Sequence, residues 1–191
     1  IFYLPLFFLL KNQSLNRWHY YGAFIFIAIA FITYPNNSAD QFRFLFNGEL
    51  IRIFHFSPYE KLPIQFPPNQ YSQFFYYTWW AKFPSPYGPF WDFLMVIINF
   101  LSKNTLSAGI ILLKLLNIIG LFICYKLIYK ITKNKSLAYL FLINPVLIIN
   151  VAQSPHPDIL IAALVLFAFS STNFFKSSIS LSLAVLTKIH V

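Results

Sequence analysis

Acidic side chains, which can act as general acids or bases and can bind metals, are scarce in this chain: five occur in 191 residues. They are Asp40, Glu49, Glu60, Asp92 and Asp158. All five lie in two polar stretches, residues 35–92 and 154–158, whereas the rest of the chain is largely apolar, aromatic or basic. A carboxylate beside a lipid bilayer is costly unless it is paired, hydrated or functional. The distribution therefore predicts chemistry confined to one side of a membrane.

Asp40 stands at the start of a predicted helix over residues 41–56. Apolar residues recur there at helical spacing, with Gln41, Arg52 and His55 roughly opposite, which predicts a helix lying flat in the membrane interface. An aspartate at the start of a helix can cap free backbone amides. A carboxylate held at a membrane surface can instead act as a general base or a metal ligand. The spacing alone leaves both interpretations open.

A dense aromatic segment follows, from Tyr71 to Phe83, and it has two interpretations. Tyr and Trp gather where a protein crosses the boundary between membrane and water, so the segment can be an interfacial belt. The same rings can also form a stacking wall for a sugar or a polyprenyl chain. The proline-rich run 84–89 that comes next predicts a rigid turn.

Polar residues inside two apolar runs have both a functional and a structural interpretation. Lys114 lies in the middle of such a run, with Asn117 on the same face. A charge at that depth is a candidate for function, here a contact with a lipid phosphate. The alternative is a lysine that snorkels to the surface or pairs with a neighbouring helix. Asn144-Pro145 predicts a kink in another run, because proline removes one helical hydrogen bond.

The composition places the chain among integral membrane proteins. Hydrophobic residues make up 58% and charged residues 10%, outside the range of soluble domains. The net charge of +9 comes from cations that mostly flank apolar runs, which indicates the lipid bilayer rather than nucleic acid as partner. Because these runs are long and do not alternate, we predict an all-α, polytopic transmembrane helical bundle. We expect one integral membrane domain over residues 1–191, as a fragment of a longer protein.

Five apolar runs are long enough, or nearly so, to cross a bilayer as helices. The predicted spans cover about residues 18–34, 105–129, 137–151, 159–171 and 179–191. Phe93–Leu101 is too short to cross, and we predict that it forms a non-spanning helix within a large external loop, residues 35–104. If this segment did cross, Asp40 and Asp158 would face opposite sides of the membrane.

The basic residues favour the topology in which Phe93–Leu101 does not cross. Seven cations then share one side of the membrane without any acid. They are Lys11, Arg17, Lys126, Lys130, Lys133, Lys135 and Lys176. The positive-inside rule makes this side cytoplasmic, so all five carboxylates face the extracytoplasmic side. We therefore expect a multi-pass protein of the cell membrane with an active site facing outward.

Several segments occur in an order that resembles the GT-C membrane glycosyltransferases. They are Asp40, Ser57-Pro58-Tyr59, Tyr87-Gly88-Pro89-Phe90-Trp91, Asn144-Pro145, His156-x-Asp158 and Lys188. The likeness is strongest to bacterial polyprenol-phosphate-mannose-dependent mannosyltransferases, and it is more distant to the catalytic subunit of GPI mannosyltransferase I. It covers nearly all of the chain, which would be the N-terminal part of such an enzyme.

The resemblance implies a set of site residues. The essential aspartate of the first external loop maps onto Asp40, and the Tyr-Gly-Pro segment maps onto Tyr87 and Gly88. A later His-Asn-Asp motif maps onto His156 and Asp158, with a proline here in the middle position. The first loop has no paired Asp-x-Asp, which weakens the case for a metal held by two adjacent carboxylates. A divalent metal, Mg²⁺ or Mn²⁺, stays open as a cofactor, and no metal ligands are assigned.

The resemblance also implies a reaction. A hexose, in the expected case mannose, moves from a polyprenyl-phosphate donor to a glycan or glycolipid acceptor on the outer face of the membrane. The transfer inverts the anomeric carbon, and Asp40 acts as the base. The departing phosphate needs positive charge or hydrogen bonds, for which His156, Arg43, Arg52 and Lys188 are candidates.

Tyr59, Tyr87, Gly88 and Lys114 complete the substrate contacts that we expect. Two other functions remain compatible with the sequence. One is a polytopic membrane transporter, because buried charges and broken helices also mark transport pathways. The other is a non-catalytic scaffold of cell-envelope assembly, in which Asp40 only caps a helix.

Overall fold

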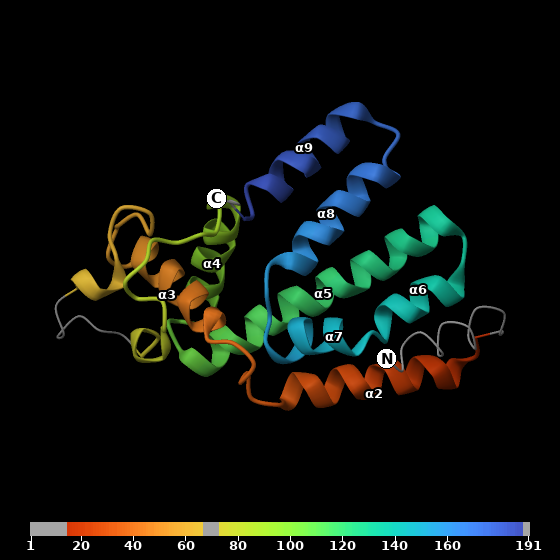
Figure 1. Ribbon diagram of the computed structural model, residues 1–191, viewed down its shortest axis with the longest axis horizontal. Coiled ribbons are helices and arrows are strands. Elements are labelled where there is room, and N and C mark those ends of the chain that lie inside the picture. The colour runs from red at the N-terminus through yellow and green to blue at the C-terminus, as the bar shows by residue number, and fades with distance from the viewer. Residues whose placement is uncertain (1–14, 67–72, 189–191) are drawn as a thin grey trace.

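The computed structural model describes residues 15–66 and 73–188 as an elongated array of helices (Figure 1). The described α-helices are α2 (Arg17–Ile32), α3 (Asp40–Arg52), α4 (Pro89–Leu101), α5 (Leu106–Thr132), α6 (Lys135–Leu142), α7 (Pro145–Ile148), α8 (Asp158–Ser170) and α9 (Phe174–Val185). Two 3₁₀ turns, Pro63–Gln65 and Phe75–Tyr77, lie between α3 and α4, and a π-helical turn, Ile149–Gln153, continues α7. The expected all-α fold is confirmed. Lys11 and Tyr71 lie outside the described residues, as do the last three residues of the expected span 179–191.

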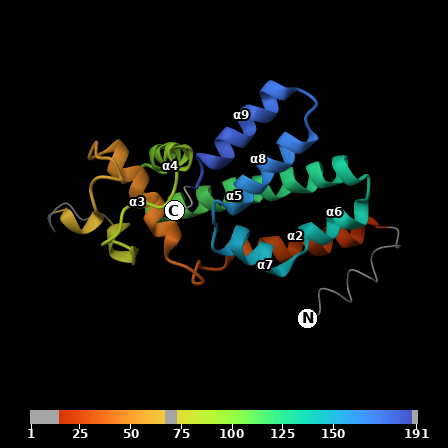
Figure 2. The ribbon, with the colours of Figure 1, turned by 45° about the horizontal axis from the view of Figure 1, so that its top comes forward.

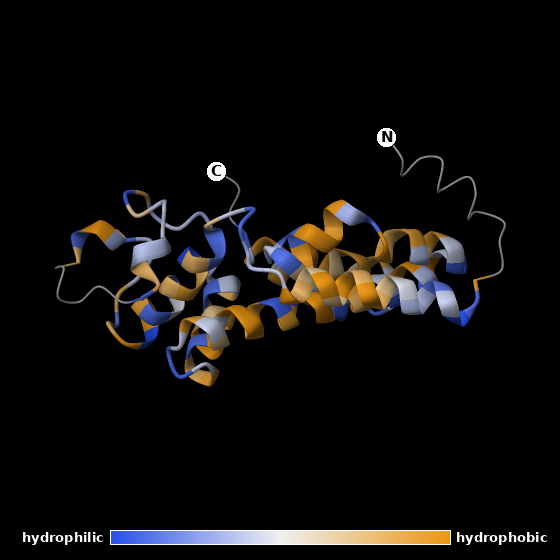
Figure 3. Cartoon of the chain, turned by 90° about the horizontal axis from the view of Figure 1, so that it is seen from below, coloured by the Kyte–Doolittle hydropathy of each residue, from blue (hydrophilic) through white to orange (hydrophobic). Residues whose placement is uncertain are grey.

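The helices form two packed parts that share the long helix α5 (Figure 1). In the bundle part, α2 and α6 to α8 pack with α5 around apolar side chains such as Leu121 and Tyr139. In the second part, which we name the external part after the predicted external loop, α3 packs against α4, and Leu113 of α5 reaches into their shared core. Helix α9 packs on α8. Hydropathy colouring shows a mainly apolar bundle part and an external part with more polar surface (Figure 3).

Helix α5 alone, among the described helices, is long and apolar enough by itself to cross a membrane. The pair formed by α6 and the stretch Pro145–Gln153 passes the same test together, with a bend of 48° between its halves. Asn144 sits at this bend, and its side chain accepts hydrogen bonds from the amides of Val146 and Leu147. The kink expected at Asn144-Pro145 is therefore confirmed. Helices α2, α4, α8 and α9 are apolar but shorter, so the number of crossings remains a prediction.

Helix α3 does not lie on the surface, and the expectation of an interfacial helix over residues 41–56 was wrong. All ten residues from Gln41 to Leu50 are buried. Two of the polar ones find partners inside the external part: Arg43 donates to Asn47, and Asn47 donates to the carboxylate of Asp92 on α4. Hydrogen-bond partners far away in the sequence thus allow α3 to bury polar side chains. The spacing of residues within the helix had predicted that these side chains face water.

The contact between α3 and α4 depends on Gly48. A Cβ atom at this position would lie 2.3 Å from the carbonyl oxygen of Met95, a distance that real contacts do not reach. The absent side chain therefore lets the two backbones approach closely, which is a general use of glycine inside packed helices.

Replacing Gly48 with Ala is expected to destabilise the protein by about 1–3 kcal/mol, the usual cost of overpacking a core. Gly22 in α2 is the matched control, because a Cβ atom there meets nothing within 4 Å. Gly22→Ala should leave the thermal unfolding midpoint unchanged or raise it, since Ala favours helix over Gly by about 1 kcal/mol. Thermal unfolding of both variants in detergent tests this, and equal midpoints would contradict the close contact.

Candidate functional site

Asp40 is the first residue of α3, and its carboxylate faces side chains from distant segments. Its Oδ2 atom lies 3.5 Å from Nε2 of His156, and the hydroxyl of Tyr87 donates to the same oxygen at 3.5 Å. The cap position is held by Ala39, which makes no side-chain capping bond. About a quarter of the Asp40 side chain is exposed. The geometry thus favours a chemical role over the capping interpretation.

The loop before Asp40 is tied to the π-helical turn that precedes His156. The side chain of Gln153 donates to Oδ1 of Asn36 at 2.8 Å, and the amide of Asn37 donates to Oγ of Ser154 at 3.3 Å. These bonds hold the segment before Asp40 against the segment before His156, although Asp40 and His156 are 116 positions apart in the sequence.

The ring of His156 is oriented by three contacts. Its Nδ1 lies 2.6 Å from the carbonyl oxygen of Ser154, and because a carbonyl only accepts, Nδ1 carries a proton. That leaves Nε2 directed at Asp40. The ring of Phe44 meets His156 edge to face at 6.3 Å and Tyr87 at 4.6 Å. Phe44 lies one helical turn after Asp40, so its ring forms the buried floor of the site.

The two groups shift each other's pKa in opposite directions. The hydrogen bond to His156 holds the pKa of Asp40 below its ordinary value, although burial acts against it. Burial lowers the pKa of His156, but the bonds to Asp40 and the Ser154 carbonyl outweigh it, together with the charges of Asp40 and Asp158, so the pKa is raised. An ion pair of carboxylate and imidazolium is therefore favoured near neutral pH.

Asp158 and Lys188 form a second ion pair beside the first. The ammonium of Lys188 donates to Oδ1 of Asp158 at 3.0 Å. Asp158 begins α8, and most of its side chain is exposed. Burial raises the pKa of Tyr87, and the charges of Asp40 and Asp158 raise it further, which shows that both carboxylates act on this phenol. Tyr87 thus remains a neutral hydrogen-bond donor.

A backbone clasp brings Tyr87 and Lys188 together. We use this name for residues 86–90 paired with residues 186–188. Tyr87 and Lys188 form an isolated antiparallel bridge, and the amides of Gly88 and Phe90 donate to the carbonyls of Thr187 and Leu186. The end of α9 accordingly reaches the start of α4 in both ribbon views (Figures 1 and 2).

Gly88 serves this clasp and does not line a pocket with Asp40. A Cβ atom on Gly88 would lie 2.1 Å from the carbonyl oxygen of Leu186. The structure therefore gives a packing reason for a glycine that the sequence resemblance assigned to substrate binding. Its neighbour Tyr87 carries the side chain that reaches the site.

Arg43 lies one turn into α3 and lines a pocket together with Asp40 and Tyr87. Its guanidinium donates to Asn47 and to the carbonyls of Trp80 and Phe83, at distances of 3.0, 3.0 and 3.1 Å. Burial lowers its pKa to about 10, while the charge of Asp92 acts in the opposite direction. Arg43 is thus a buried cation at physiological pH, within the candidate site.

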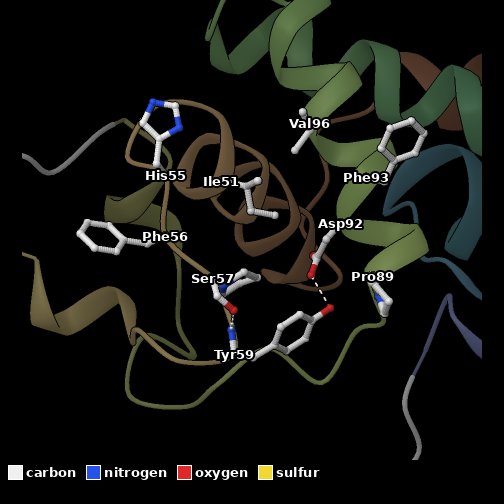
Figure 4. Close-up of a pocket in the computed structure, with 10 residues that line it drawn as sticks. Ile51, His55, Phe56, Ser57, Tyr59, Pro89, Asp92, Phe93 and Val96 are labelled. Carbon is white, nitrogen blue, oxygen red and sulfur yellow. Dashed lines mark hydrogen bonds between the residues drawn. The ribbon is translucent and has the colours of Figure 1, made fainter.

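Three of the predicted substrate contacts lie elsewhere. Tyr59 donates to Oδ2 of Asp92 at 2.7 Å, beside a separate pocket of about 610 Å³ between α3, α4 and residues 55–59 (Figure 4). Arg52 donates to Asn99 at the far end of α3. Lys114 donates to the carbonyls of Phe31 and Thr33, at the end of α2. For Lys114, the geometry supports pairing with a neighbouring helix.

The sequence also missed residues that shape the site. Asp92 is 2% exposed, and burial raises its pKa to about 6 despite hydrogen bonds from Tyr59 and Asn47. Asn47 joins this carboxylate to Arg43, with which it shares helical i, i+4 spacing, a signal that was visible in the sequence. Phe44 has the same spacing from Asp40.

Within residues 15–66 and 73–188, no three His, Cys, Asp or Glu side chains gather as a metal site requires.

Replacing Asp40 with Asn should lower the pKa of His156, because it removes both a hydrogen bond and a negative charge that favour the imidazolium. Asp158→Asn is the matched control, since Asp158 contributes only its charge, and we expect a smaller decrease. Histidine-selective NMR titration in detergent micelles measures both changes. An unchanged His156 pKa in the Asp40 variant would contradict the pair.

A family model described as alpha-(1->6)-mannopyranosyltransferase, N-terminal domain, matches residues 7–191. No curated protein matches the chain, and no solved structure does. The family match agrees with the resemblance to membrane mannosyltransferases and covers almost every residue, including Asp40, Tyr87, His156 and Asp158. This chain therefore belongs to the MptA/B family of α-(1→6)-mannopyranosyltransferases.

Proposed function

We propose that this mannosyltransferase takes mannose from a polyprenyl-phosphate donor and transfers it, with inversion, to a glycan or glycolipid acceptor. The observation that carries the proposal is the contact between Asp40 and His156, surrounded by Tyr87, Asp158 and Lys188. A carboxylate, a cation and a hydroxyl donor are the groups needed to activate an alcohol and to stabilise a departing phosphate.

In the proposed step, the acceptor hydroxyl binds to the Asp40 carboxylate and attacks the anomeric carbon of the donor sugar. The new carbon–oxygen bond forms while the bond to the phosphate oxygen breaks, and the electron pair leaves with the polyprenyl phosphate. The hydroxyl proton passes to Asp40. A carboxylate is a much weaker base than an alkoxide, so its proton transfer accompanies attack and does not precede it.

The leaving phosphate requires positive charge, which we assign to His156 and Lys188. Each cation is paired with a carboxylate of the site, Asp40 or Asp158, and its positive charge favours the phosphate as negative charge develops there. Since these cations already occupy the two carboxylates, the residues present do not fit a Mg²⁺ or Mn²⁺ ion. No step is assigned to a metal.

We infer that the site faces the extracytoplasmic side of a multi-pass membrane protein. The turn between α5 and α6 carries Lys130, Lys133 and Lys135. It lies at the opposite end of the molecule from α3 and α4 (Figure 1). This separation of a basic end from the end that holds the carboxylates supports the orientation given by the positive-inside rule.

Family membership favours an enzyme over the transporter and the scaffold. A transporter would bring polar groups together near the middle of the bilayer. The one charged residue in the middle of α5, Lys114, is instead bonded to backbone carbonyls at the end of α2.

Asp40→Asn is expected to reduce mannose transfer by about two to four powers of ten, the usual contribution of a general base. The measurement is transfer from radiolabelled polyprenyl-phosphate-mannose in membranes that contain the full-length protein, at equal expression. Glu60→Gln is the control, because Glu60 is an exposed acid outside the site. Transfer at the wild-type rate by the Asp40 variant would assign the base to another residue.

His156→Gln should move the acidic limb of the pH–rate profile to higher pH. Transfer requires unprotonated Asp40, and His156 keeps the pKa of Asp40 below the ordinary carboxylate range. Without the imidazolium, Asp40 takes up a proton at a higher pH, so activity is lost earlier as the pH falls. Rates measured from about pH 3 to about pH 8, a range that includes the ordinary pKa values of a carboxylate and an imidazole, test this. If the acidic limb lay at the same pH in the wild type and the variant, His156 would not influence the base, and the prediction would be wrong.

A further inference from the structure

The Asp40–His156 pair lies between two pockets of different chemistry. The first, which we call the outer pocket, has a volume of about 320 Å³ and is lined by Asp40, Arg43, Trp80, Phe83 and Tyr87, with two prolines. The second, the bundle pocket, has a volume of about 340 Å³ and includes His156 and Asp158. Each pocket thus contains one partner of the central pair, and each has the size of a small-ligand site.

The walls of the bundle pocket come from helices of the bundle part. Phe141 of α6, Leu147 of α7 and Ile159 of α8 line it, so the pocket is mainly aliphatic and aromatic apart from His156, Asp158 and Asn150. Apolar walls beside charged side chains suit a ligand that combines a lipid chain with a polar head. The bundle pocket is consequently the side of the central pair that suits a lipid-linked donor.

The walls of the outer pocket come from the external part. Trp80 and Phe83 are more than half exposed, and their rings meet at 6.0 Å and 60°. Exposed aromatic rings beside a charged hydrogen-bond donor are typical of a sugar site, because the apolar faces of a pyranose pack on rings while its hydroxyls bind polar groups.

Arg43 links the aromatic wall of the outer pocket to helix α3, which also carries Asp40. It is 3% exposed, and its hydrogen bonds to the carbonyls of Trp80 and Phe83 fix the backbone that carries both rings. With the bond to Asn47, these use three of the five guanidinium N–H groups. Two N–H groups remain for a ligand in the outer pocket, on the side that Asp40 also lines.

We propose that the outer pocket is the acceptor site: it binds the terminal hexose of the acceptor, with Trp80 and Phe83 packed on the sugar and Arg43 donating to its hydroxyls. This assignment rests on the proposed transferase function. It places the acceptor hydroxyl at Asp40 from one side, while the donor reaches His156 and Asp158 from the other side. The pair then sits where the two substrates meet.

The test is a steady-state comparison of Trp80→Ala with Trp79→Ala in the full-length protein in membranes, with a methyl α-mannopyranoside acceptor and polyprenyl-phosphate-mannose as donor. Trp79 is the matched control, since it is 81% exposed and lines neither pocket. Trp80→Ala should raise the acceptor KM roughly tenfold, as truncation of an aromatic anchor does, and leave the donor KM unchanged.

A second variant gives the opposite pattern. Leu147→Phe narrows the bundle pocket and should raise the donor KM without changing the acceptor KM. A rise of the donor KM in Trp80→Ala would assign the outer pocket to the donor and overturn the proposal. Equal acceptor KM values in the Trp80 and Trp79 variants would overturn it as well. If the wild-type protein neither transfers mannose nor hydrolyses the donor, the proposed function itself fails.

Discussion

Two backbone hydrogen bonds and one antiparallel bridge hold residues 86–90 against residues 186–188, and the arrangement of the site depends on them. The clasp joins the external part to the end of α9. It fixes two side chains of the candidate site at once, because Tyr87 contacts Asp40 and Lys188 contacts Asp158. Its close approach requires the missing side chain of Gly88. Four separate segments of the chain are thereby held around one small volume.

The electrostatics of this volume follow from pairing under partial burial. Burial alone would favour neutral forms of both Asp40 and His156, but their mutual contact outweighs it, and the two groups remain charged. Lys188 and Asp158 repeat the arrangement in a more exposed position. The charges of these two pairs cancel, and the buried Arg43 adds one further positive charge to the site. This excess of positive charge suits the proposed reaction, whose leaving group is anionic.

The sequence alone was enough to identify three residues that gather at the candidate site. Asp40, His156 and Asp158 stood out because acids are rare in this chain and because their order resembles a known family, and the structure brings all three together. The helical class followed from long apolar runs. The same reasoning could not place Arg52 or Tyr59, since both form bonds with α4 that no spacing reveals. It misjudged α3 for the same reason: the partner of Asn47 lies 45 residues away.

The length of α5 has a consequence for where the reaction takes place. A helix of 27 residues extends about 40 Å, whereas the hydrocarbon core of a bilayer is about 30 Å thick. With its basic end at the cytoplasmic headgroups, as proposed, about 10 Å of α5 is left to tilt or to rise through the opposite headgroups. The start of α5 packs on α3 and α4. In the proposed orientation, the external part therefore lies at the depth of the lipid phosphates, which is where the proposed polyprenyl-linked donor would carry its sugar.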